Sequence, residues 1–218
     1  MAESASRDYF EHLRESYTRG GLSEEDLAPD PFAQFHRWFD EAVAAGLREP
    51  NAMTLATVES DGSPDARVVL LKDLSAAGFS FFTNRLSVKG RQLAGEPRAA
   101  LVFFWGPLER QVRVRGTVAA LGDAESAAYF RTRPRASQLG AWASAQSEVL
   151  PDRAALAARF HEVEARLEGR DVEMPPYWGG YRLAPREIEF WQGRENRLHD
   201  RLRYRQQGTA WIIERLSP

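Results

Sequence analysis

The stretch Arg110-Gln-Val-Arg-Val-Arg-Gly-Thr-Val118 indicates the class of the fold. Val112, Val114 and Val118 fall on one face of an extended chain, and polar side chains fall between them. Because successive side chains of a strand point to opposite faces, this alternation predicts a strand with one buried face. Further strands are predicted at residues 53–58, 67–72, 79–83, 99–104, 181–183, 187–191, 198–204 and 210–215. So many short strands predict a mainly β protein, either a closed antiparallel barrel decorated by helices or an open antiparallel sheet.

Capping signals predict the helices that lie between these strands. Asp30-Pro31 supplies an N-cap followed by proline at the first helical position, and apolar residues recur at helical spacing to about Leu47. Three other helices are predicted to be capped by Ser87, Asp123 and Ser137, and a longer helix is predicted at residues 152–168. Residues 1–29 are expected to form a flexible N-terminal arm, and residues 30–218 are expected to form a single domain.

Composition excludes several classes of protein. The chain of 218 residues has 29 basic and 31 acidic residues, a balance that argues against binding nucleic acid through phosphate contacts. It has no cysteine, which excludes disulfides, thiolate zinc sites and cysteine nucleophiles. No signal peptide and no apolar run of about 18–20 residues is present, so we expect a cytoplasmic protein without a membrane partner.

The sequence contains no glycine-rich dinucleotide fingerprint, no phosphate loop and no nucleophile elbow. A phosphorylated ligand would therefore need separate basic groups. Tyr129 and Arg133 lie about one helical turn apart, and Ser137 opens the next helix, whose free N–H groups attract anions. These groups suit a phosphate monoester; a helix cap beside a surface arginine is the alternative interpretation.

A second polar group follows near the C-terminus. In a regular strand, Arg197, His199 and Arg201 lie on one face. A cationic face favours the neutral imidazole, which is able to accept a proton. A solvated strand face is the alternative interpretation.

The segment Arg67-Val-Val-Leu-Leu-Lys72 has an apolar centre with one cationic residue at each end. In a regular strand Arg67 and Lys72 point to opposite faces. They are then predicted to serve different ligands, unless a bulge intervenes.

Together these segments resemble the pyridoxamine 5'-phosphate oxidase family, whose fold is an FMN-binding split β-barrel. The resemblance covers nearly the whole chain, and its motifs occur in the order of the family. The motifs are Arg14-Glu-Ser-Tyr17, Arg67-Val-Val-Leu-Leu-Lys72, Phe82-Thr-Asn84, Glu109-Arg-Gln-Val112, Arg133-Pro-Arg-Ala-Ser-Gln-Leu-Gly-Ala-Trp142, Gln146-Ser147, Phe190-Trp-Gln192 and Asn196-Arg-Leu-His-Asp-Arg201. The resemblance implies an antiparallel Greek-key split barrel decorated by helices, with an N-terminal lid and C-terminal dimerisation strands.

The resemblance also implies an activity. Pyridoxamine or pyridoxine 5'-phosphate would be oxidised to pyridoxal 5'-phosphate, a step of vitamin B6 synthesis and salvage. Hydride would pass from C4' of the substrate to N5 of FMN, and oxygen would then be reduced to hydrogen peroxide. The protein is expected to be a homodimer with FMN at the interface, contacted by both subunits.

The resemblance assigns residues to two sites. The implied flavin-site residues are Arg67, Val68, Val69, Leu70, Leu71, Lys72, Phe82, Thr83, Lys89, Gln111, Gln146, Ser147, Trp191 and Arg201. The implied substrate-site residues are Arg14, Tyr17, Lys72, Tyr129, Arg133, Ser137, Arg197 and His199. We expect Arg197 to orient the substrate ring and stabilise developing charge, and His199 to assist proton removal.

One departure and two alternatives qualify these expectations. Val88 stands where the family usually has arginine, which predicts weaker FMN retention unless Arg85 or Arg91 compensates. One alternative is a related flavin oxidase of another pathway, such as a phenazine-type member. The complete set of expected phosphate-binding residues, Lys72, Tyr129, Arg133 and Ser137, argues against it. The other is a non-catalytic split-barrel protein that binds flavin or haem, against which the pair Arg197 and His199 argues.

Overall fold

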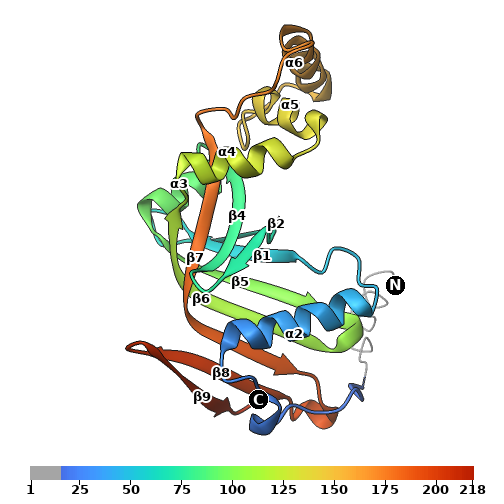
Figure 1. Ribbon diagram of the computed structural model, residues 1–218, viewed down its shortest axis with the longest axis vertical. Coiled ribbons are helices and arrows are strands. Elements are labelled where there is room, and N and C mark those ends of the chain that lie inside the picture. The colour runs from blue at the N-terminus through green and yellow to red at the C-terminus, as the bar shows by residue number, and fades with distance from the viewer. Residues whose placement is uncertain (1–15) are drawn as a thin grey trace, which may run out of the picture. The chain divides into compact units, whose positions relative to one another are not determined.

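The computed structural model describes residues 16–218, and Arg14 therefore lies outside the described residues. A nine-stranded sheet has the order β2-β1-β5-β6-β7-β4-β3, and β8 pairs with both β7 and β9 (Figure 1). The strands are β1 Ala52–Val58, β2 Pro64–Leu70, β3 Asp73–Ser75, β4 Gly78–Asn84, β5 Arg98–Trp105, β6 Arg110–Ala120, β7 Trp178–Gln192, β8 Asp200–Gln207 and β9 Ala210–Leu216. The register pairs β1 with β2 and β5, and β4 with β3 and β7, in each case antiparallel. The predicted antiparallel split barrel with helices between the strands is confirmed.

The chain divides into two compact units. Among the described residues, the terminal unit contains 16–48, Phe104–Val112 and Ile188–Pro218, and the central unit contains Glu49–Phe103 and Arg113–Glu187. Strands β5, β6 and β7 contribute residues to both units.

The helices follow the predicted capping signals with two exceptions. Their bounds are α2 Pro31–Ala44, α3 Val88–Gly95, α4 Asp123–Thr132, α5 Arg135–Ala143 and α6 Arg153–Arg166, with 3-10 turns at Glu24–Asp26, Gly106–Leu108 and Glu195–Arg197. The predicted caps at Asp30 and Ser87 are confirmed, because each side chain accepts a backbone N–H of the first turn. Asp152 caps α6 in the same way. The predictions for Asp123 and Ser137 are wrong, since Gly122 and Pro134 are the N-caps and both residues lie inside the helices.

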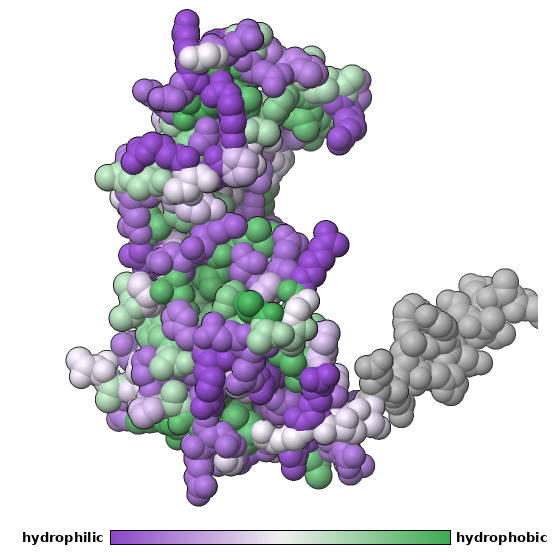
Figure 2. Space-filling model, turned by 45° about the vertical axis from the view of Figure 1, so that its right-hand side comes forward, coloured by the Kyte–Doolittle hydropathy of each residue, from purple (hydrophilic) through white to green (hydrophobic). Residues whose placement is uncertain are grey.

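Apolar side chains form a separate core in each unit. In the terminal unit the Trp38 ring meets the Phe190 ring edge-on at 5.1 Å, and Phe35 packs against Trp105. In the central unit the predicted valines Val114 and Val118 are buried. Hydrophilic side chains cover much of the face that Figure 2 presents. Of the helices in residues 16–218, none combines the length and the apolar character that crossing a membrane requires.

Two strand predictions near the C-terminus need correction. The strands predicted at residues 181–183 and 187–191 are one continuous strand, β7, which runs through Pro185 without ending. The strand predicted to begin at Leu198 begins at Asp200 instead, so Leu198 and His199 precede it. The short strand β3 was not predicted, because its three residues are too few to show a period.

Candidate active site

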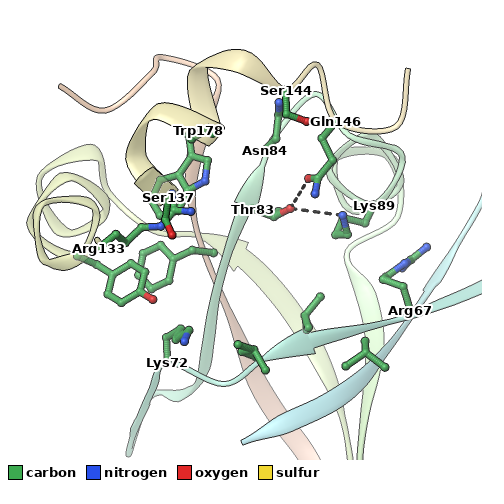
Figure 3. A pocket seen from close by; sticks show the side chains of 17 residues that line it. Arg67, Lys72, Thr83, Asn84, Lys89, Arg133, Ser137, Ser144, Gln146 and Trp178 are labelled. Carbon is green, nitrogen blue, oxygen red and sulfur yellow. Dashed lines mark hydrogen bonds between the residues drawn. The ribbon is translucent and has the colours of Figure 1, made fainter. Parts of the chain in front are cut away.

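The central unit contains an open cavity of about 700 Å³, a volume typical of small-molecule sites. Its lining residues are Arg67, Val68, Val69, Leu70, Lys72, Phe82, Thr83, Asn84, Lys89, Tyr129, Arg133, Ser137, Gly140, Ala141, Ser144, Gln146 and Trp178. Four of these side chains are cationic and none is acidic. Figure 3 shows Arg67 and Lys89 on one side of the cavity, and Lys72, Arg133 and Ser137 on the other.

Arg67 lies in β2 and Lys72 follows the end of that strand, and both line the same cavity, which the sequence pattern did not predict. The strand ends at Leu70, and the Lys72 backbone N–H then donates to the Ser80 carbonyl at 2.9 Å. Alternation does not continue past the end of a strand, so the prediction that both residues sit in one regular strand is wrong. They nevertheless lie on opposite sides of the cavity (Figure 3).

Arg67 and Lys89 form the first cationic group. The Arg67 guanidinium donates to Asp65, Thr57 and Gln92. The Lys89 side chain, only 8% exposed, donates from Nζ to Thr83 Oγ1 at 3.4 Å. Burial lowers the pKa of Lys89, and the charge of Arg67 lowers it further, against a smaller opposing effect of Asp65. Two neighbouring cations in a buried setting favour an anion between them.

Thr83 and Gln146 add neutral hydrogen-bonding groups to the side of the cavity that contains Lys89. The Thr83 hydroxyl donates to Gln146 Oε1 at 2.9 Å, so that Lys89, Thr83 and Gln146 form a hydrogen-bonded chain (Figure 3). Ser147 does not line the cavity, but its Oγ accepts the Val88 N–H at the start of α3.

The second cationic group is built by α4, α5 and the end of β2. Tyr129 and Arg133 come from the last turn of α4 and its C-cap, and Ser137 comes from the first turn of α5. Arg133 is extended (ψ 146°), as expected for a residue before proline. Within the described chain Arg133 has no ion pair, and its Nη1 atom is buried without a hydrogen-bond partner. The structure thus brings Lys72, Tyr129, Arg133 and Ser137 together.

The two predicted catalytic residues, Arg197 and His199, belong to the terminal unit and do not line this cavity. Asn196 and Arg197 adopt left-handed backbone conformations, with φ of 56° and 62°. The prediction that Arg197, His199 and Arg201 share one strand face is therefore wrong, because only Arg201 lies in β8. The change of backbone direction at Arg197 breaks the alternation.

His199 is fixed by three neighbours within the terminal unit. Its Nδ1 accepts the Arg194 backbone N–H at 3.1 Å. Its ring centroid lies 4.6 Å from that of Trp191 and 5.6 Å from that of Tyr17. The ring of Tyr17 also packs edge-on against Trp191, which brings three predicted residues into contact.

The remaining predicted flavin-site residues are not among the residues that line the cavity. Leu71 is buried, and Gln111 lies half-buried in β6. Arg201 pairs with Glu189 at 2.8 Å and also donates to the Ser217 carbonyl.

Five cavity residues were missed: Asn84, Gly140, Ala141, Ser144 and Trp178. Asn84, Gly140 and Ala141 stand inside the family motifs but were assigned to no site, and a separate sequence signal marks Trp178. It precedes Gly179 and Gly180, and consecutive glycines in a strand indicate a close approach of backbone to another group.

The fold and the cavity define a split-barrel protein with a polar, cationic pocket whose charge suits a small anionic molecule. Comparisons with known proteins narrow this class. Residues 39–167 match the family model described as pyridoxamine 5'-phosphate oxidase, and residues 178–218 match the pyridoxine 5'-phosphate oxidase C-terminal dimerisation region. The chain belongs to the pyridoxamine 5'-phosphate oxidase family, a family of oxidoreductases.

Individual relatives agree with this assignment. The pyridoxine/pyridoxamine 5'-phosphate oxidase of Rubrobacter xylanophilus is 57% identical over 218 residues, which is 100% of both chains. That of Cupriavidus taiwanensis is 60% identical and covers 94% of this chain and 97% of its own. Among solved structures, PhzG from Burkholderia lata, in complex with tetrahydrophenazine-1-carboxylic acid, has a TM-score of 0.85 at 35% identity, covering 90% of this chain and 98% of that one. An FMN binding protein of Nostoc punctiforme (TM-score 0.68, 18% identity, covering 88% and 99%) shares the fold.

Proposed function

We propose that the protein binds FMN and oxidises pyridoxamine and pyridoxine 5'-phosphate to pyridoxal 5'-phosphate, with oxygen reduced to hydrogen peroxide. The observation that carries this proposal is the division of one acid-free cavity into two cationic groups. A flavin mononucleotide and a vitamin B6 phosphate each carry one phosphate monoester. Two separate cationic groups match two such ligands in one cavity.

The residues around Arg67 fit the phosphate end of FMN. Arg67 and Lys89 supply two cations, and Thr83 and Gln146 add neutral hydrogen-bonding groups. Asp65 holds Arg67 from one side, which orients the guanidinium. When bound, FMN would supply the hydride acceptor of the reaction.

The second group fits the phosphate of the substrate. Arg133 and Lys72 would neutralise its charge, and the hydroxyls of Tyr129 and Ser137 would donate hydrogen bonds. Holding the phosphate fixes where the rest of the substrate lies, and such positioning lowers the entropic part of the barrier for a reaction between two bound molecules.

The dimer supplies the rest of the site in this proposal. Residues 178–218 match a dimerisation region, and they include Trp191, Arg197, His199 and Arg201. We propose a homodimer in which FMN is contacted by both subunits. Gln111, Ser147, Trp191 and Arg201 would complete its site, and Arg14 and Tyr17 would cover the substrate.

Arg197 and His199 would act on the substrate ring. Arg197 would orient the ring and stabilise charge that develops as hydride leaves. His199 needs a revised role, because Nδ1 already accepts the Arg194 N–H and a neutral ring then carries its proton on Nε2. A neutral His199 would donate a hydrogen bond to the substrate through Nε2–H, instead of removing a proton.

This tautomer can be observed directly. In protein labelled with ¹⁵N histidine, at about pH 8, where imidazoles are mostly neutral, we expect the His199 spectrum to show an unprotonated Nδ1 and a protonated Nε2. His199→Gln, whose amide can replace Nε2–H, should retain more turnover than His199→Asn. A protonated Nδ1 would contradict the donor role.

Val88 predicts a measurable weakness in FMN binding. Arg85 pairs with Asp123 and Arg91 with Glu148, and neither lines the cavity, so neither is placed to compensate. Val88→Arg adds a cation next to Lys89, and one charge-assisted hydrogen bond corresponds to about a tenfold tighter FMN dissociation constant. Fluorescence titration of apoprotein with FMN measures the change, and Val88→Leu is the uncharged control. Equal affinity of Val88→Arg and the unchanged protein would refute the prediction.

A phenazine-type oxidase is the rival proposal, supported by the similarity to PhzG. The cationic group around Arg133 favours a phosphorylated substrate instead. The test is an aerobic assay of the FMN-loaded protein with pyridoxine 5'-phosphate, in which aldehyde and peroxide should appear in equal amounts. Absence of both products, with oxidation of a tetrahydrophenazine, would favour the rival.

A further inference from the structure

Arg133 is held in an unusual way for a ligand-binding arginine. Its Cζ lies 4.8 Å from the ring centroid of Trp178 and 5.4 Å from that of Phe130. Among the described residues no carboxylate pairs with it, and its buried Nη1 has no hydrogen-bond partner. Burial lowers the pKa of Arg133 from its ordinary value, although a guanidinium keeps its charge at that cost. The aromatic faces are therefore its main favourable contacts in the free protein.

Arg67, in the same cavity, shows the contrast. Asp65 pairs with Arg67 and offsets part of its charge. The aromatic rings around Arg133 attract the cation through their quadrupoles and carry no net charge. They fix the guanidinium without neutralising it.

Trp178 also supports Tyr129, another residue of the cationic group around Arg133. Its ring lies nearly parallel to Phe82, with centroids 5.4 Å apart and an interplanar angle of 11°. Phe82 in turn stacks on Tyr129 at 4.0 Å. Together, Trp178, Phe82 and Tyr129 form a continuous aromatic stack.

The backbone at the start of β7 allows this stack to form. A Cβ at Gly180 would lie 2.6 Å from Cε1 of Phe82, and one at Gly179 would lie 2.4 Å from the guanidinium of Arg85. Any larger residue at Gly180 would displace the Phe82 ring. The sequence Trp178-Gly-Gly180 therefore combines the aromatic face with the space that its stacking partner needs.

We propose that Trp178 is a positioning residue that sets the preference for phosphorylated substrates. It holds Arg133 by its π face and Tyr129 through Phe82, so both are oriented toward the cavity while the arginine keeps its full charge for the substrate phosphate. This proposal rests on the proposed function for the identity of the substrate. The alternative is that Trp178 merely fills the hydrophobic cluster that it shares with Phe130 and Leu139.

The test compares Trp178→Leu and Trp178→Phe with the unchanged protein. Cation–π attraction of this kind corresponds to about a 5- to 10-fold effect on an equilibrium constant. Trp178→Leu should raise KM for pyridoxine 5'-phosphate by about that factor, with kcat changed much less. Trp178→Phe, which keeps an aromatic face, should lie between. KM for unphosphorylated pyridoxine should not change.

Phe81→Leu is the matched control. Phe81 is a fully buried aromatic residue of the neighbouring part of β4, stacks on Tyr181, and does not line the cavity. It should lower the melting temperature as Trp178→Leu does, but leave the ratio of the two KM values unchanged. If the two variants change that ratio equally, or if Trp178→Leu raises both KM values alike, Trp178 has only a packing role.

Two further measurements separate the possible failures. In the Arg133→Met background, Trp178→Leu should have little further effect on the affinity for phosphorylated substrate, because Trp178 acts through Arg133. If Trp178→Leu instead causes its full loss of affinity in that background, the proposal is overturned. Inorganic phosphate binding to the FMN-loaded protein, measured by calorimetry, should weaken in Trp178→Leu by the same factor as KM. If phosphate binding weakens but no B6 phosphate is oxidised by the unchanged protein, the proposed function fails and the positioning role of Trp178 stands. If phosphate affinity is unchanged in Trp178→Leu, the positioning role is overturned.

Discussion

Replacing Arg197 by alanine is expected to lower kcat by about 100-fold or more, while KM changes much less. A group that stabilises charge developing during hydride removal acts mainly in the transition state, so its loss appears in kcat. The backbone supports a dedicated role, since Arg197 and Asn196 both adopt left-handed conformations. Such conformations cost about 1–2 kcal/mol per residue and cluster at functional sites. Steady-state kinetics on the FMN-loaded variant measures the effect.

Two controls separate the side chain from the loop. Arg197→Lys keeps a positive charge but loses the planar guanidinium, and should fall between alanine and the unchanged protein. Arg197→Gly suits the left-handed backbone, so it should retain stability while losing turnover like alanine. Near-normal kcat in Arg197→Ala would show that the guanidinium does not act in the chemical step.

Replacing Arg67 by methionine is expected to weaken FMN binding by about 100-fold. The variant loses a cation, and it also removes the ion-pair partner of the nearby Asp65 carboxylate. A hydrogen bond from Gln92 contributes most to holding the pKa of Asp65 below its usual value, so this carboxylate stays charged at neutral pH and would repel the phosphate. Fluorescence titration of the apoprotein with FMN gives the dissociation constant.

The double variant Arg67→Met with Asp65→Asn isolates these two contributions. It removes the repelling carboxylate as well as the cation, so it should bind FMN more tightly than Arg67→Met alone. Unchanged FMN affinity in Arg67→Met would mean that the phosphate of FMN does not bind at this side of the cavity.

Local patterns predicted the elements well. The alternation in β6 placed Val112, Val114 and Val118 in the core, where they are buried. The Asp30-Pro31 signal located the start of α2, because capping depends only on the first turn. Both signals act over a few residues and can be read without knowing the tertiary structure.

Features that depend on the end of an element were not predictable in the same way. Alternation assigned Lys72 to a strand that ends at Leu70, and it assigned His199 to a strand that begins at Asp200. Nothing in the sequence indicates a left-handed Arg197, since that conformation is uncommon for residues other than glycine. Trp178 reaches Arg133 only because β7 returns beside β4 from far along the chain.

We expect the cavity to hold two phosphate monoesters, one at each cationic group. Anaerobic mixing of FMN-loaded protein with pyridoxamine 5'-phosphate or with pyridoxamine, followed by loss of flavin absorbance, tests it most directly. We expect bleaching at far lower concentrations of the phosphorylated amine, and loss of that preference in Arg133→Met. Equal concentration dependence for the two amines, or a preference that survives in Arg133→Met, would contradict it.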